Sequence, residues 1–169
     1  MKFLNFQKVL CLSPHPDDVE VGMMGSVIKH IDTQFDVLCL TRGGAKGFDD
    51  TNQLDRRGEV DNVWNTLGIN NISTLHAKYD YFEDTNEPGW INYIENEFIK
   101  KYNYDCIFIP TTDDSMFEHR FVHKFGSALC RFSPISLIEY HAFSTLNNWQ
   151  PNFFISVKKE YKNKLNALK

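Results

Sequence analysis

The sequence lacks any apolar run long enough to cross a membrane. No stretch approaches the ~20 consecutive apolar residues of a spanning helix. An apolar start at the first residues is soon interrupted by Asn5, Gln7 and Lys8, so no secretion signal is predicted. We therefore expect no integral membrane segment and a cytoplasmic location. Peripheral contact with a membrane stays open.

Paired cysteines are also missing. Cys11, Cys39, Cys106 and Cys130 are scattered through the chain without a Cys-x-x-Cys pair, and the first three lie within apolar, strand-like runs. This distribution is typical of buried thiols in a reducing compartment.

The sequence has no basic run and no excess of positive charge. Its formal net charge is −4, from 18 Lys and Arg against 22 Asp and Glu. Proteins that bind nucleic acid through its phosphates need a basic surface. We therefore expect no nucleic-acid partner and a small-molecule partner instead. The sequence leaves the formation of homo-oligomers open.

What the chain does contain is an alternation of strand-like and helix-like segments. Its 169 residues, of which 42% are hydrophobic, suffice for one domain over residues 1–169. The alternation predicts an α/β fold, a Rossmann-like three-layer sandwich with a mostly parallel sheet and helices on both faces. Strands are expected at 8–13, 35–40, 72–76, 105–110, 136–140 and 153–157. Helices are expected at about 19–30, around 60–67 with Gly68 as the stop, around 91–98, around 121–129, and in the basic tail from Lys158.

The stretch Pro14-His15-Pro16-Asp17-Asp18 places an imidazole beside two carboxylates, directly after an apolar strand-like run. Ligand crevices of α/β proteins form at the carboxyl ends of their strands, where this stretch is expected to lie. Neighbouring aspartates point in different directions, so one can bind a metal while the other faces the bound water. The alternative, that the pair only caps the following helix, stays open.

Further polar residues follow the other predicted strands. The loops after the first four strands meet at one edge of a parallel sheet. They bring together His15, Asp17, Asp18, Arg42, Asp80 and His119. Two imidazoles and one carboxylate on an ion leave a coordination position open for water, as in hydrolytic zinc centres.

Residues 14–25, Pro-His-Pro-Asp-Asp-Val-Glu-Val-Gly-Met-Met-Gly, resemble the first motif of the LmbE-like (PIG-L) family of zinc-dependent N-deacetylases. The resemblance spans nearly the whole chain. It continues through Arg56-Arg57-Gly58-Glu59, Asp80, Phe108-Ile109-Pro110, Glu118-His119-Arg120, Glu139, Ser144-Thr145 and Pro151-Asn152-Phe153-Phe154.

The resemblance implies a Zn²⁺ ion held by His15, Asp18 and His119, with Asp17 as general base. Zinc lowers the pKa of bound water to about 7, and that water would attack the acetamide carbonyl of an N-acetylated sugar or sugar conjugate. Asp17 would return the proton to the leaving nitrogen as acetate is released.

The resemblance also suggests substrate contacts. Arg56 and Asp80 match positions that look like sugar-contacting residues of the family. An exposed helix arginine and a turn aspartate are the alternatives. Arg42 has no firm family counterpart, but its place beside Gly43 suits an anionic substrate group, whereas a solvated loop charge is the simpler interpretation.

The chain departs from the family in two places. Met116 stands where the motif His-x-Asp-His has its first histidine, which in the family stabilises the oxyanion. A thioether cannot donate a hydrogen bond, and loss of one oxyanion donor typically lowers turnover ~10²–10³-fold. His123, Tyr140 and His141 are the candidate replacements, and His141 is also a candidate substrate contact.

The second departure is length, because family members usually continue for tens of residues, so the domain is expected to be short at its carboxyl end. These departures keep two other functions open. One is a catalytically degenerate relative that binds a sugar or a metal. The other is a zinc amidohydrolase acting on a non-sugar amide.

Overall fold

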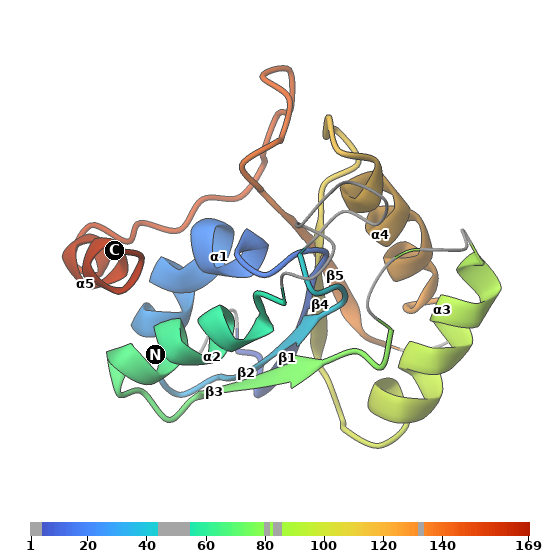
Figure 1. Cartoon of the computed structure of the whole chain (residues 1–169), viewed down its shortest axis with the longest axis horizontal. Helices are drawn as coiled ribbons and strands as arrows, with labels where there is room; N and C mark the ends of the chain where they lie inside the picture. Colours follow the sequence, from blue (N-terminus) through green and yellow to red (C-terminus); the bar gives the residue numbers. More distant parts are fainter. Residues whose placement is uncertain (1–4, 44–54, 80–81, 83–85, 132–133) are drawn as a thin grey trace.

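A five-stranded sheet forms the centre of the molecule, with strand order β3-β2-β1-β4-β5 (Figure 1). A computed structural model describes residues 5–43, 55–79, 82, 86–131 and 134–169. The strands are β1 (Lys8–Ser13), β2 (Gln34–Cys39), β3 (Ile72–His76), β4 (Cys106–Pro110) and β5 (Ser136–Tyr140). Each pairing in this sheet is parallel. The predicted α/β sandwich is therefore confirmed, with a sheet that is parallel throughout.

Helices cover both faces of the sheet (Figure 1). They are α1 (Asp18–Lys29), α2 (Arg57–Leu67), α3 (Glu87–Ile94) with the π-helical turn η2 (Glu95–Ile99), α4 (Phe117–Ala128) and α5 (Tyr161–Ala167). The core against α1 and α2 takes Val9 and Cys11 from β1, whereas the core against α3 and α4 takes Leu10 and Leu12. Successive side chains of a strand point to opposite faces, so an uninterrupted apolar strand can fill both cores.

The predicted end of the second helix is also present. Gly68 follows α2 with φ 62° and ψ 27°, in the left-handed region that glycine adopts without steric strain. The apolar face of α2 buries Val60 and Trp64 against the core beneath α1.

The prediction of a sixth strand at 153–157 is wrong, because these residues are described by the structure and form no strand. The backbone oxygen of Ser156 accepts a hydrogen bond from Lys29 Nζ at 2.7 Å. Val157 packs against Gly25 so closely that an added Cβ would lie 2.9 Å from its Cβ. These contacts hold the segment on α1, and β5 is left as an edge strand.

None of the helices in the described part of the chain combines the length and the hydrophobicity needed to span a bilayer. All four cysteines carry free thiols; Cys130 is half-buried and the other three are buried.

The chain runs outward from β1 through β2 to β3 and then returns to β4 on the other side of β1. The loops after β1 and β4 therefore leave neighbouring strands in opposite directions. Such a switch point opens a crevice at the carboxyl edge of a parallel sheet.

Candidate metal centre

Three polar side chains meet at this switch point. His15 follows β1, Asp18 begins α1, and His119 lies in the first turn of α4. The Nδ1 atom of His15 lies 3.2 Å from Nε2 of His119. Asp18 Oδ2 lies 3.3 Å from His15 Nδ1, and Asp18 Oδ1 lies 3.2 Å from His119 Nε2.

The donor atoms of these three residues lie close enough together to hold a metal ion. A tetrahedral ion with bonds of about 2.0–2.1 Å holds its donors about 3.3 Å apart. Among the described residues, these three form the one group of histidine and acidic side chains whose donor atoms lie close enough to hold an ion, all within 4.8 Å of one another. Two imidazole nitrogens and one carboxylate oxygen make a donor set that zinc accepts.

The charge state of Asp18 suits a ligand. Burial acts to raise its pKa, but hydrogen bonding to His119 and His15 outweighs burial and lowers the pKa to about 2. The backbone N–H of His15 also donates to Asp18 Oδ2 at 2.8 Å. Asp18 is therefore ionised and held in place at neutral pH.

A fourth side chain, Asp114, orients His119 from behind. Its Oδ2 lies 3.0 Å from His119 Nδ1, which directs Nε2 of that ring toward the other donors. Its Oδ1 accepts hydrogen bonds from the Ser144 hydroxyl at 2.6 Å and from the Met116 backbone N–H at 2.9 Å. Asp114 is not among the site residues predicted from the sequence. The signal in the sequence was the pair Asp113-Asp114 after β4, with Asp114 five residues before His119.

Burial alone would lower the pKa of His119. The ionised Asp18 and Asp114 outweigh burial and raise that pKa above its ordinary value. Without an ion, the cluster thus favours a proton on His119. An ion that binds there has to displace this proton, so its affinity falls as the pH falls.

Asp17 stands at the first position before α1, but its side chain makes no capping hydrogen bond. Its carboxylate instead accepts a hydrogen bond from Arg56 Nη1 at 3.2 Å. Its φ of 142° lies in a region that only glycine adopts without strain, which costs about 1–3 kcal/mol. The alternative in which Asp17 caps the helix through its side chain is therefore not supported by the geometry.

Burial raises the pKa of Asp17, and the neighbouring Asp18 carboxylate acts in the same direction while Arg56 opposes both. The side chain remains about half exposed. An accessible carboxylate with a raised pKa is a stronger base than an ordinary aspartate, which suits proton transfer.

A cavity of about 440 Å³ opens over these residues. Its polar lining includes Asp17, Arg56 and Glu118. Its apolar lining consists of Val21, Met116 and Phe143, all of them exposed, and Phe143 is 91% exposed.

The remaining predicted substrate contacts do not all line this cavity. Arg56 lines the cavity, and its backbone N–H donates to the backbone oxygen of Arg42 at 2.9 Å. Arg42 is half-buried and does not itself line the cavity. Asp80 lies outside the residues that the structure describes.

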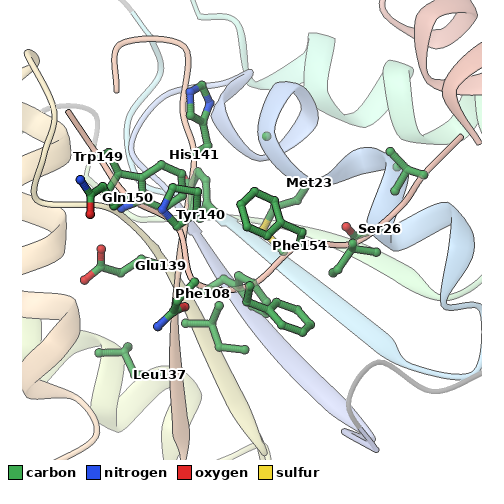
Figure 2. Close-up of a pocket in the computed structure, with 18 of the residues that line it drawn as sticks. Met23, Ser26, Phe108, Leu137, Glu139, Tyr140, His141, Trp149, Gln150 and Phe154 are labelled. Carbon is green, nitrogen blue, oxygen red and sulfur yellow. The ribbon is translucent and has the colours of Figure 1, made fainter. Parts of the chain in front are cut away.

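His141 borders a different cavity, of about 680 Å³, between α1 and β5. Figure 2 shows this second cavity, with Met23 and Ser26 of α1 on one side, residues of β5 on the other, and His141 at the top of the view. The Tyr140 hydroxyl donates to the Leu12 backbone oxygen at 3.0 Å.

His123 likewise has a partner outside the metal centre, since its Nε2 lies 2.9 Å from Glu139 Oε1. None of the three candidate replacements for the missing histidine (His123, Tyr140, His141) lines the cavity over the metal centre. Met116 does line it, so a thioether occupies that wall.

Comparison with known proteins gives a family and a set of similar folds. The sequence model of PIG-L, described as GlcNAc-PI de-N-acetylase, matches residues 10–130. No curated protein matches the chain.

Solved structures resemble the chain over almost its full length. N,N'-diacetylchitobiose deacetylase from Pyrococcus horikoshii has a TM-score of 0.73 and 21% identity, covering 98% of this chain and 70% of that chain. The A40926 pseudoaglycone deacetylase Dbv21 has a TM-score of 0.67 and 16% identity, covering 95% and 79%. GalB, the 4-carboxy-2-hydroxymuconate hydratase of Pseudomonas putida KT2440, has a TM-score of 0.69 and 15% identity, covering 96% and 78%. At these identities the likeness establishes a shared fold.

Proposed function

Because the chain belongs to the PIG-L family, we propose that it removes the N-acetyl group of an amino sugar or sugar conjugate and releases acetate. The reaction would use zinc held by His15, Asp18 and His119. The observation that carries this proposal is the cluster of donor atoms of His15, Asp18 and His119, all within 4.8 Å of one another, beside a cavity that His15, Asp17 and Asp18 line.

Zinc bound there would polarise the acetamide carbonyl and lower the pKa of water, so that a hydroxide nucleophile is available at neutral pH. Asp17 takes a proton from the attacking water and delivers it to the nitrogen of the leaving amine. Arg56 donates to the Asp17 carboxylate and holds it at the cavity wall. Because Asp17 is half exposed, its other oxygen can reach the substrate side.

The substrate contacts follow from the lining of the cavity. Arg56 presents a guanidinium that can donate to sugar hydroxyls, and Glu118 presents an acceptor. Arg42 supports Arg56 through its backbone oxygen. Asp80 and His141 stay predictions from the family resemblance, and His141 borders the second cavity.

The test combines metal analysis with an assay of acetate release from a panel of N-acetyl sugars. Asp17→Asn should retain stoichiometric zinc and lose acetate release. Glu97→Gln, a matched loss of an exposed carboxylate on η2, should change neither. The double variant His15→Ala/His119→Ala should lose the zinc. Undiminished zinc in that double variant would show that the site is misassigned.

A second function, a catalytically inactive relative that binds a sugar or a metal, is favoured by Met116. A fold of this kind also serves a hydratase, so the fold by itself does not select deacetylation. Stoichiometric zinc together with no acetate release from any sugar of the panel would select this second function.

We place the protein in the cytoplasm. Support comes from the four free cysteines, three of them buried within the sheet. Free thiols persist where the surroundings are reducing.

A further inference from the structure

The last twelve residues of the chain differ in charge from the rest. The whole chain has a net charge of −4, whereas residues 158–169 contain five lysines and one glutamate, a local charge of +4. An asymmetry of this kind points to a partner with negative charge.

Helix α5 lies within this segment and uses one side to pack on the protein. Ala167 packs against the core, and Lys164 reaches back to the backbone oxygen of Val21. The attachment of α5 is therefore already provided by residues that face inward. The rest of the helix surface is exposed and available for another contact.

An apolar stripe runs along the helix beside this packed side. Tyr161, Leu165 and Leu168 follow the i, i+4, i+7 spacing that aligns side chains along one face of a helix. All three are partly exposed, Tyr161 at 56%, Leu165 at 41% and Leu168 at 36%. An aligned set of exposed apolar side chains on a surface helix is unfavourable in water unless something covers it.

Lysines flank this stripe. Lys158, Lys159 and Lys162 are exposed, and within the described part of the chain none of them forms an ion pair. Their long side chains can place the ammonium groups beside the apolar stripe while they remain hydrated.

The segment that leads into α5 adds an aromatic side chain. Phe154 is 79% exposed and borders the second cavity, which Lys164 of α5 also lines (Figure 2). The exposed phenyl ring and the helix thus belong to one stretch of chain that lies along α1. We call Phe154, Lys158, Lys159, Tyr161, Lys162, Leu165 and Leu168 the tail surface.

From this arrangement we propose that the tail surface binds the face of a bilayer rich in anionic phospholipids. Lysines beside exposed aromatic and leucine side chains suit a headgroup layer, where phosphates meet the ammonium groups and apolar side chains reach the acyl boundary. A nucleic-acid partner would match the lysines and leave the leucine stripe in water. The contact is peripheral and independent of the proposed deacetylation.

The experiment is co-sedimentation of the full chain with phosphatidylcholine vesicles and with vesicles that also contain phosphatidylglycerol. We expect binding only to the second kind, and weaker binding at high salt, since salt screens exposed charges. Each lysine near an anionic surface contributes about fivefold in affinity, so Lys158→Gln/Lys159→Gln/Lys162→Gln should bind about 10²-fold more weakly.

The matched control is Lys100→Gln/Lys101→Gln/Lys124→Gln. It removes the same charge from the side of the molecule built by η2 and α4, and it should bind like the unmodified protein. Tyr161→Ser/Leu165→Ser should bind about tenfold more weakly, because apolar contact is lost. Circular dichroism checks that each variant is folded.

Three results would overturn the proposal. One is that the unmodified protein does not bind anionic vesicles. Another is that the control weakens binding as much as the tail variant. The third is that the tail variant loses affinity for single-stranded DNA while its binding to vesicles is unchanged.

Discussion

The cavity over the metal centre has two sides that are built differently. On one side His15, Asp18 and His119 are joined by hydrogen bonds, and Asp114 orients His119 from behind. On the other side Val21, Met116 and Phe143 are apolar and exposed, and their side chains offer no N–H or O–H donor. The ligand side can fix an ion, whereas the apolar side offers nothing to stabilise an oxyanion.

The largest effect is expected at Asp17, where one substitution should lower activity without lowering stability. Asp17→Gly should lower acetate release ~10²–10⁴-fold, because the proton acceptor is lost. The same change should leave the free energy of unfolding unchanged or raise it by up to about 1 kcal/mol, because glycine adopts φ 142° without strain. Acetate assays and urea unfolding measure the two quantities.

Asp17→Ala is the matched control for this variant, since it also removes the carboxylate but keeps a side chain at the strained position. It should lose activity without gaining stability. Equal stability changes in the two variants would argue against backbone strain at Asp17.

A hydrogen-bond donor introduced at position 116 tests directly whether the apolar side lacks an oxyanion contact. Met116→His returns a hydrogen-bond donor to the cavity wall and should raise acetate release ~10²–10³-fold, with zinc content unchanged. Phe117→His places the same side chain at the next, exposed position outside the cavity lining, and it should have no effect. An equal response from both variants would argue against position 116 as an oxyanion contact.

Most of the fold could be predicted from local patterns. The strands at Lys8–Ser13, Ile72–His76 and Ser136–Tyr140 lie where the sequence predicted them, because apolar, β-branched runs bounded by turn residues are strong local signals. The segment 153–157 carries the same kind of signal and forms no strand. Its conformation is decided by Lys29 and Gly25 of α1, far away in sequence.

The residues of the candidate site could likewise be predicted only in part from the sequence. The positions of His15, Asp18 and His119 after predicted strands, together with the family motifs, predicted a common site, and the structure places their donor atoms together. Their roles stay predictions. Asp114 could not be distinguished from Asp113 in the sequence, because only the fold buries Asp114 against His119. Membership of the family was predicted from the same motifs and is confirmed by the match over residues 10–130.

A smaller effect is expected from the residue behind the ligand side. Asp114→Asn should weaken zinc affinity about 10–100-fold, because an amide orients the His119 ring less strongly than a carboxylate. Asp113→Asn is the control, and it should bind zinc like the unmodified protein. Zinc titration with a competing chelator measures the affinity. Unchanged affinity in Asp114→Asn would mean that the orientation of His119 comes from elsewhere.

The smallest effect concerns Glu20, which lies two residues beyond Asp18 in α1 and is 2% exposed. Its Oε1 accepts a hydrogen bond from Trp64 Nε1 at 2.5 Å, and within the described residues its Oε2 has no partner. Burial raises the pKa of Glu20 to about 7, mainly by penalising the charged form. Below the unfolded-state pKa the carboxyl is neutral in both states. As the pH rises, the carboxyl of the unfolded protein ionises first. The folded protein therefore loses stability until the pH has passed the folded-state pKa.

The zinc-free protein should therefore lose stability between pH 5 and pH 8, and Glu20→Gln should lose about 1–3 kcal/mol less over that range. The amide keeps an acceptor for Trp64 and cannot ionise. Urea unfolding at the two pH values in the presence of a chelator measures the difference. Parallel losses in both proteins would mean that Glu20 titrates normally.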